Sequence, residues 1–261
     1  MTSELYPESL GFRKGPIGSH SSRTMMLAEL SALLSCCEPE ANWPDFLEAI
    51  VAQNILGKST TSVRKSTAQK LRELYALDRS VPVFRMLRRV WDLDPEGQAL
   101  SALLVAMARD PLLRCTAEPV LSLSEGAMLD RGRVTRAVTD LVGERQNENT
   151  RDKVVRNASS SWTQSGHLEG RTFKRRRRVR ATTGPLIMAL FLGYLQGRRG
   201  PGVIDTFWTR VLDCPVDRVK NMASTASLSG LIRFRSAGDV LDIGFPDMLS
   251  QAEQERLHES D

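Results

Sequence analysis

Cysteine and histidine are scarce in this chain, and their scarcity limits the chemistry that it can carry. There are four cysteines and three histidines, and no two cysteines stand at the Cys-x-x-Cys spacing of a zinc site. The motifs GxSxG, HExxH and GxxxxGKS/T are also absent. The glycines of GRRGPG at 197–202 lack the Lys-Ser/Thr pair that completes a phosphate-binding loop. We therefore expect a protein that is not an enzyme, with no catalytic residue, no metal and no cofactor.

Long apolar runs are missing as well. The longest nearly apolar stretch, Pro185 to Leu195, is shorter than the about 20 residues that a helix needs to span a bilayer. It is therefore predicted to be a buried helix. The first residues, MTSELYPESLGFRKG, have no apolar centre, so we expect no secretory signal. With so few cysteines, we expect a cytoplasmic protein with reduced thiols and no membrane partner.

Positive charge is in modest excess but is concentrated in one place. Lys and Arg number 36 against 31 for Asp and Glu, which gives a net charge of +5. Between residues 171 and 180 every charged side chain is Lys or Arg. A local cluster of this kind attracts a polyanion more effectively than the net charge does.

Apolar residues recur at helical spacing through the N-terminal half. Between residues 24 and 142 this pattern predicts about six or seven short helices and no strand, which is typical of a helical bundle. The segment before it is polar and rich in Gly, Ser and Pro, as terminal arms often are. We therefore expect a flexible arm at 1–23, a helical bundle at 24–145 and a different C-terminal region at 146–261.

The C-terminal region contains two similar segments. Residues 154–168 (VVRNASSSWTQSGHL) and 218–232 (RVKNMASTASLSGLI) align without a gap. Each reads as a helix, a Ser-Gly turn, one apolar residue and a basic segment, and residues 231–245 alternate like a hairpin. Gly166 and Gly230 are expected to supply the positive φ at which a helix stops. We predict a mainly α fold whose C-terminal region holds two winged-helix-like units with short β-hairpins, at about 146–184 and 203–247.

The basic run and its surroundings carry the main candidate binding residues. Cations clustered on a hairpin can straddle a DNA backbone, and each phosphate that they neutralise releases counterions. Gln, Ser and Thr can add hydrogen bonds to bases or phosphates, whereas Trp162 is expected to be a core residue. The first unit is predicted to form the main contact, through Gln164, Ser165, His167, Arg171, Lys174, Arg175, Arg176, Arg177, Arg178 and Arg180.

Two further contacts are predicted from the pattern of cations. Hydroxyls and cations crowd the start of the predicted helix at 59–77, where free N–H groups and the helix dipole can bind a phosphate. The residues there are Lys58, Ser59, Arg64 and Lys65. Arg233 and Arg235 on the second hairpin form the third predicted contact. An ordinary capped, solvated helix remains the alternative for the contact at 59–77.

The order of these features resembles the BrxA family of bacteriophage-exclusion (BREX) defence systems. The resemblance rests on Asn54-Ile55-Leu56, the Ser/Arg-rich helix at 59–77, SALLVAMARDPLLRCTAEPVL at 101–121 and the NTRDK helix start at 149–153. It covers about 24–180 and implies a fold similar to the antitermination protein NusB, together with DNA binding. It identifies no catalytic residue. The arginine run and the additional C-terminal unit depart from the family, which leaves a sister family of another phage-defence system open.

Three functions remain open at this point. The resemblance and the basic run favour a DNA-binding accessory protein of an antiphage system, with double-stranded DNA as its partner. Alternatively, the basic hairpin docks on an acidic surface of another defence-system protein, such as a methyltransferase or an ATPase. A transcriptional regulator of the defence operon is the third reading, and RNA is not excluded as the nucleic acid.

Overall fold

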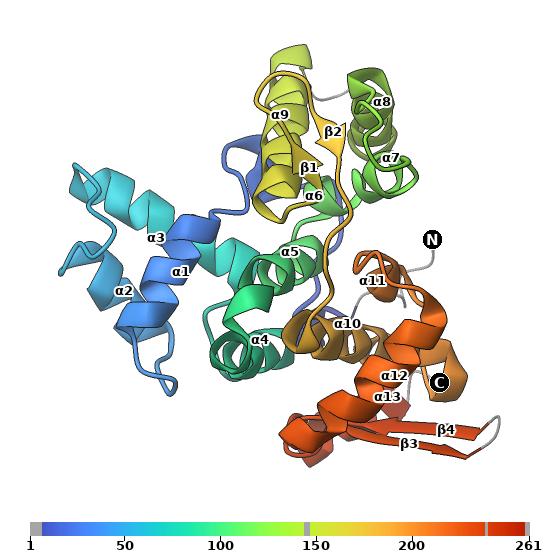
Figure 1. The fold of residues 1–261 in the computed structure, drawn as a ribbon. Coiled ribbons are helices and arrows are strands. Elements are labelled where there is room, and N and C mark those ends of the chain that lie inside the picture. The colour runs from blue at the N-terminus through green and yellow to red at the C-terminus, as the bar shows by residue number, and fades with distance from the viewer. Residues whose placement is uncertain (1–6, 144–146, 238–239, 259–261) are drawn as a thin grey trace.

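The computed structural model describes residues 7–143, 147–237 and 240–258, and these residues form a mainly helical fold (Figure 1). The prediction of a mainly α protein is confirmed. Strands occur, within the described residues, as two antiparallel hairpins, β1–β2 and β3–β4. The first unit of the predicted C-terminal region thus contains one hairpin and the second unit contains the other.

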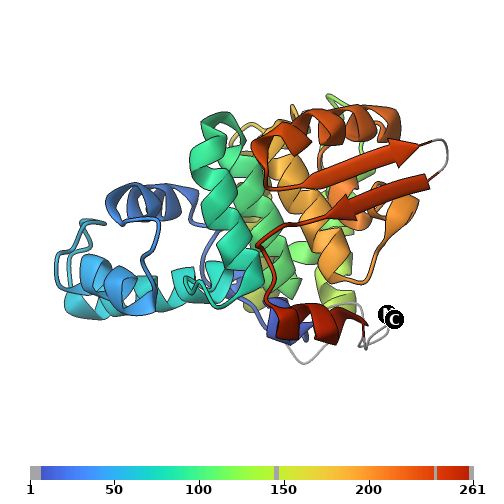
Figure 2. The ribbon, with the colours of Figure 1, turned by 90° about the horizontal axis from the view of Figure 1, so that it is seen from below.

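The first three helices form a lobe at one side of the molecule (Figures 1 and 2). They are α1 (Leu27–Cys36), α2 (Trp43–Val51) and α3 (Thr61–Tyr75). Asn42 and Asp45 form a reciprocal capping box that begins α2, and the Thr60 hydroxyl accepts the Val63 N–H at the start of α3. α2 ends at Val51, and a turn joins it to α3.

The centre of the molecule is built around one very apolar helix. α10 (Thr183–Leu195) is buried along nearly its whole length and packs on α4 (Pro82–Leu93) and α5 (Gln98–Arg109). This confirms that the apolar run is a buried helix. Helices that are hydrophobic all round belong inside a protein, because no face of them is stable in water.

A second group of helices lies at the top of Figure 1. It contains α6 (Pro111–Arg114), α7 (Ala117–Leu121), α8 (Arg131–Val142) and α9 (Glu148–Gln164). α8 and α9 pack together over a small separate core of Leu112, Val134, Val138, Val154 and Val155. The main core runs from Leu10 to Leu257 and includes Ala158 and Trp162 of α9. Residues from both sides of the predicted boundary at 145/146 therefore share one core.

The remaining elements cover the other side of α10. They are α11 (Phe207–Arg210), α12 (Val216–Ala226), β3 (Arg233–Ala237), β4 (Val240–Gly244) and α13 (Gln251–His258). Short 3-10 turns occur along the chain at Glu8–Leu10, Ser19–Ser21, Pro95–Gly97, Gly200–Val203 and Ser227–Ser229. The pairing of Arg233 with Gly244 and of Phe234 with Ile243 confirms the hairpin predicted at 231–245.

The expectation of a flexible arm is wrong for residues 7–23; residues 1–6 lie outside the described part. Leu10 and Phe12 are buried in the main core. The Arg109 guanidinium donates to the Gly11 carbonyl, and the Arg13 N–H donates to the Ala108 carbonyl. The segment is polar in composition, but Leu10 and Phe12 are buried and its backbone is bonded to α5.

The internal repeat is visible at equivalent positions of the two units. Gly166 and Gly230 both have positive φ, +89° and +74°, as predicted. Immediately before them, the Ser165 hydroxyl donates to the Trp162 carbonyl and the Ser229 hydroxyl donates to the Ala226 carbonyl. The apolar residues two positions after the glycines, Leu168 and Ile232, are both buried. The local pattern therefore gives the same helix end and the same entry into a hairpin twice.

Candidate nucleic-acid interface

The first unit presents its basic residues on a short hairpin beside α9. β1 (Leu168–Glu169) pairs with β2 (Arg175–Arg176). A third segment joins the other edge of β2: the Leu129 N–H donates to the Lys174 carbonyl and the Arg176 N–H donates to the Ala127 carbonyl. The chain then runs down from the hairpin to α10 (Figure 1). We call residues 171–180, from the hairpin turn through β2 to the segment that follows it, the basic strand.

One arginine of the basic strand points inward. The Arg176 side chain is fully buried, at 0% exposure, and its guanidinium donates to the Asp213 carboxylate and to the His167 carbonyl. The expectation that Arg176 contacts phosphate is therefore wrong. Neighbouring residues of a strand point to opposite faces, so a strand of arginines that packs on the protein must direct one of them inward.

Asp213 is the anchor of the basic strand. Its carboxylate accepts hydrogen bonds from Arg176, from the Arg178 guanidinium at 2.8 Å and from the Val179 N–H at 3.0 Å. Burial alone would raise the pKa of this carboxyl, but the hydrogen bonds from Arg176, Val179 and Arg178 outweigh it and hold the pKa below its usual value. Asp213 is thus a carboxylate at neutral pH, and it fixes the strand at residues 176, 178 and 179.

Ser165 and His167 also lie inside the protein, contrary to the expectation that they face a groove. The His167 ring donates through Nε2 to the Val211 carbonyl at 2.8 Å, and its Nδ1 lies 2.9 Å from the Ser165 hydroxyl. Its ring packs edge-on against Trp162, which is buried as predicted. Burial lowers the pKa of His167 to about 4, so the ring is neutral. Both residues support the turn and do not reach its surface.

Gln164 is half-buried and is also engaged within the fold. Its Oε1 accepts the Leu27 N–H at 3.2 Å, which joins the end of α9 to the start of α1. This bond is one of several by which α9 holds N-terminal segments. The Gln164 side chain is therefore hydrogen-bonded to the backbone within the fold.

Apart from Lys174, the other cations of the basic run face solvent. Lys174 is half-buried and donates to the Thr163 hydroxyl and the Gly170 carbonyl. Arg177 lies 3.6 Å from a Glu169 oxygen and 3.9 Å from a Glu125 oxygen, and all three side chains are about half exposed. The exposed set, which we call the outer face of the basic strand, consists of Arg171, Arg175, Arg177, Arg178 and Arg180.

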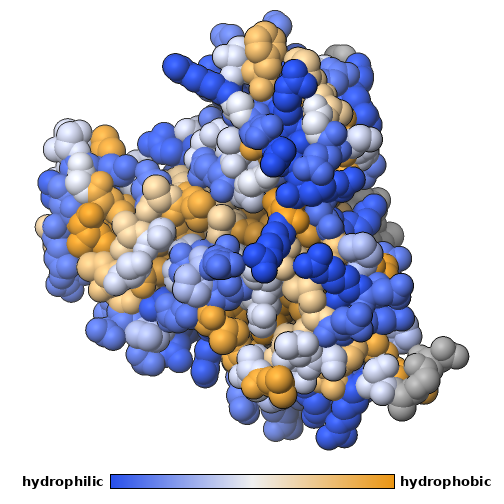
Figure 3. Space-filling view, in the orientation of Figure 1, coloured by the Kyte–Doolittle hydropathy of each residue, from blue (hydrophilic) through white to orange (hydrophobic). Residues whose placement is uncertain are grey.

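Helices α8 and α9 place more cations near the hairpin. Arg131 pairs with Asp152 at 3.1 Å, and Arg136 lies 3.9 Å from Asp130, in both cases between exposed side chains. Further exposed cations on these helices are Arg133, Lys153 and Arg156. The space-filling view is accordingly hydrophilic over most of α8, α9 and the hairpin (Figure 3).

The two other predicted contacts lie elsewhere on the molecule. The loop before α3 is at the far left of Figures 1 and 2, away from the hairpin. There Lys58 pairs with Glu29, and the Arg64 guanidinium donates to the Lys58 and Val51 carbonyls, which leaves Ser59 and Lys65 exposed. The structure therefore brings the four residues together, but not with the basic strand.

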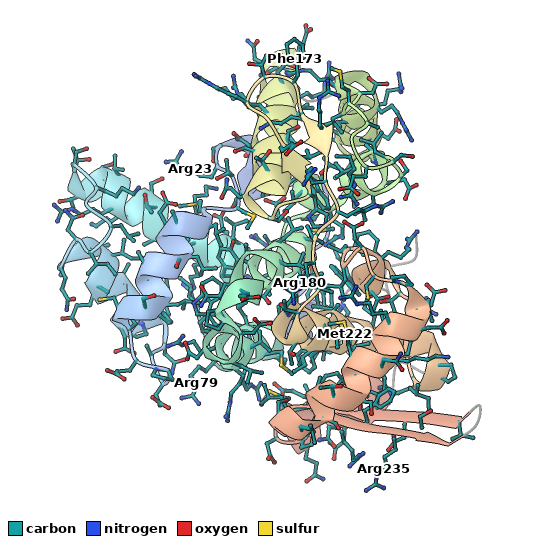
Figure 4. The ribbon with its side chains drawn as sticks, in the orientation of Figure 1. Arg23, Arg79, Phe173, Arg180, Met222 and Arg235 are labelled. Carbon is teal, nitrogen blue, oxygen red and sulfur yellow. The ribbon has the colours of Figure 1, made fainter. Side chains whose placement is uncertain are left out.

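The second hairpin is also remote from the first. Figure 4 shows Arg235 at the bottom of the molecule, Phe173 at the top and Arg180 between them. Arg233 and Arg235 are exposed, and the Arg233 guanidinium lies 3.5 Å from the Asp242 carboxylate. The three predicted contacts are therefore separate from one another, and the basic strand has the most exposed cations of the three.

A buried Asp–His–Ser arrangement was not found by sequence reasoning. His20 Nδ1 lies 2.8 Å from Asp110 Oδ2, and His20 Nε2 lies 2.8 Å from Ser161 Oγ. The three side chains are at most 1% exposed. The Ser161 hydroxyl also accepts the Met25 N–H and donates to the Asn157 carbonyl. In this conformation no substrate can reach the serine, and the network fastens residues 19–25 to α9.

The described residues, 7–143, 147–237 and 240–258, contain no group of three or more His, Cys, Asp or Glu side chains that could hold a metal ion. No helix among them is long and apolar enough to cross a membrane. All four cysteines are free.

No protein-family model matches the sequence, and no curated protein matches it either.

Proposed function

We propose that this chain is a non-enzymatic DNA-binding accessory protein of a bacterial antiphage defence system, acting in the cytoplasm. The observation that carries the proposal is the outer face of the basic strand. Its five arginines are exposed while Arg176, in their midst, is buried against Asp213. The inward arginine fixes the strand, and the outward ones are held in a row on a stable backbone.

The nearby carboxylates neutralise this row only in part, because the one buried carboxylate, Asp213, is shared by Arg178 and the inward Arg176. Ion pairs between half-exposed side chains, such as Arg177 with Glu125 and Glu169, contribute only about 0–1 kcal/mol. A DNA phosphate offers a stronger competitor, because each phosphate that is neutralised also releases counterions. Arg171 and Arg180 have no ion-pair partner among the described residues. Double-stranded DNA is therefore the polyanion that we assign to this surface.

The antiphage role rests on the resemblance to the BrxA family and not on the geometry. The non-enzymatic role is supported by the burial of the one Asp–His–Ser arrangement that the described residues contain, at Asp110, His20 and Ser161. An accessory protein that holds DNA for other defence-system proteins needs a rigid basic surface and no catalytic group.

The test is a DNA-binding titration of the triple variant Arg171→Ala, Arg175→Ala and Arg180→Ala, beside the wild type, at several salt concentrations. The slope of log affinity against log salt is about −0.9 for each phosphate contact. The triple variant should therefore bind more weakly and its slope should be shallower by about 2 to 3.

A matched variant controls for the loss of charge. Arg72, Arg89 and Arg198 are also exposed but lie on α3, on α4 and after α10. Their replacement by Ala removes the same charge and should leave the slope unchanged. If both triple variants change the slope equally, or if the wild type does not bind duplex DNA, the basic strand is not a phosphate clamp.

A further inference from the structure

The hairpin of the first unit ends in an exposed aromatic ring. Phe173 is 70% exposed and lies at the extreme end of the hairpin, far from the core (Figure 4). Its neighbours Arg171, Thr172 and Lys174 are polar, and the space-filling view shows an apolar side chain at this end of the molecule among hydrophilic ones (Figure 3). The ring contributes nothing to the core of this fold.

The turn that carries the ring is closely built. Gly170 has a φ of +95°, and a Cβ atom at this position would lie only 2.2 Å from the Phe173 carbonyl oxygen. The turn therefore closes on itself in a way that a side chain at residue 170 would prevent.

Lys174 then ties the turn to the rest of the protein. Its Nζ donates to the Gly170 carbonyl at 2.7 Å and to the Thr163 hydroxyl at 2.9 Å, so the turn is connected to the last residues of α9. The backbone that carries the ring is therefore held in place before any ligand binds. Less conformational entropy is then lost on binding.

We propose that Phe173 is a wedge that inserts between neighbouring base pairs of double-stranded DNA. This inference rests on the proposed function, because the arginines beside the ring must first hold the phosphates. In this arrangement the hairpin tip enters the minor groove, and Arg171 and Arg175 bind the DNA backbone on the two sides of the groove. The ring then stacks between two neighbouring base pairs, which no longer stack on each other. Proteins that insert apolar side chains in this way kink the duplex.

The wedge determines which kind of duplex the protein should prefer. Opening a base step costs stacking energy, and this cost is smaller at a mismatch or at a flexible pyrimidine–purine step. The protein should therefore prefer duplexes with weakened stacking, and it should bend them. The exposed arginines alone would give neither property, since phosphate contacts carry no information about stacking.

The experiment compares the wild type with Phe173→Ala on two duplexes of about 30 bp, one fully paired and one with a single central mismatch. Affinity is measured by anisotropy, and bending by energy transfer between dyes at the two ends. We expect the wild type to bind the mismatched duplex about tenfold more tightly, as the stacking of one ring on a base allows. Phe173→Ala should bind both duplexes equally and should not bend them.

Two further variants separate the ring from apolar surface in general. Met128 is 49% exposed and pairs with Arg175 across the edge of β2, so Met128→Ala removes apolar area beside the tip but not at it. It should behave like the wild type. Phe173→Trp keeps a ring and should keep the preference and the bend.

The outcomes distinguish the wedge from the binding function that it rests on. If Phe173→Ala loses the preference and the bend but keeps the salt slope, the wedge is supported. If the wild type binds DNA with no preference, or Phe173→Ala keeps both properties, the wedge is refuted while DNA binding stands. If the wild type binds neither duplex, both proposals fail together.

Discussion

The two helix–hairpin units share a local pattern but are held to the protein by different forces. In the first unit, β1 and β2 have two residues each, and the inward residue of β2 is the charged Arg176. In the second, β3 and β4 have five residues each, and β4 directs the apolar Leu241 and Ile243 inward.

This difference shows what a repeated motif does and does not specify. The Ser-Gly helix end and the buried residue after it recur in both units, because they depend on neighbours in the chain. The anchor of each hairpin depends on what lies beneath it. A charged anchor needs a partner such as Asp213, whereas an apolar anchor needs only an apolar surface.

The largest effect should come from removing the charged anchor. Asp213→Asn leaves Arg176 buried with no negative partner, which costs about 3 to 5 kcal/mol in known cases. Asn tolerates the left-handed backbone at this position, where φ is +51°. The loss of stability therefore measures the loss of the negative charge and not backbone strain. Urea unfolding should show the lowered midpoint. A loss below about 1 kcal/mol would mean that the buried pair does not anchor the hairpin.

The next effect is a pH dependence of the free energy of unfolding, which the turn of the first unit should cause and the turn of the second unit should not. His167 has a pKa lowered by burial from 6.5 to about 4, and Leu231 occupies the equivalent position of the second unit. Between pH 6.5 and about 4 the unfolded chain takes up a proton at His167 that the native protein does not. The free energy of unfolding should therefore fall by about 3 kcal/mol as the pH is lowered through this window.

His167→Leu should remove that pH dependence while leaving the remaining profile parallel to the wild type. Its stability at neutral pH is expected to change as well, so the slope between pH 6.5 and 4 is the informative quantity. Unfolding midpoints at a series of pH values give this slope. An unchanged slope in the variant would assign the effect to another group.

A smaller and equal effect is expected at the two glycines. Gly166→Ala and Gly230→Ala each place a side chain in the left-handed region, which costs about 1 to 2 kcal/mol. A Cβ at Gly166 would meet only Val179, at 3.5 Å, and a Cβ at Gly230 would meet no atom within 4 Å. The two losses should therefore match in thermal unfolding. Unequal losses would show that the turns differ despite their common sequence.

The smallest effect is expected at the ion pair of the second hairpin. Arg233 and Asp242 are both about half exposed and 3.5 Å apart, so Asp242→Asn should change the free energy of unfolding by less than about 1 kcal/mol. This variant is the counterpart of Asp213→Asn in the first unit. Similar losses in the two variants would contradict the view that the hairpins are anchored by different forces.

The parts of the fold that local chemistry determines could be predicted from the sequence. The apolar run at 185–195, the hairpin at 231–245 and the positive φ of Gly166 and Gly230 depend on residues near one another in the chain. The predicted units at 146–184 and 203–247 each contain a hairpin. Their identity as winged helices stays a prediction.

The candidate site was harder to predict because its decisive contacts are long-range. His20 meets Asp110 and Ser161 across 90 and 141 residues, and a Gly- and Ser-rich segment gives no local sign of such burial. Arg176 looks like its neighbours in the sequence, and Asp213 looks like a helix cap. Strand alternation would have shown that one arginine must point inward, but only the fold identifies which one.

The pairing of Arg176 with Asp213 has a consequence for the order in which the protein is assembled. The two residues are 37 positions apart, and α10 lies between them in the chain. During synthesis the arginine run leaves the ribosome first, and it remains an unanchored cationic segment until Asp213 has emerged and α10 has packed. β2 can therefore pair with β1 and with residues 126–129 early, but its Asp213 anchor forms only when most of the chain exists. A nascent protein that stops before Asp213 would carry the arginines without this anchor.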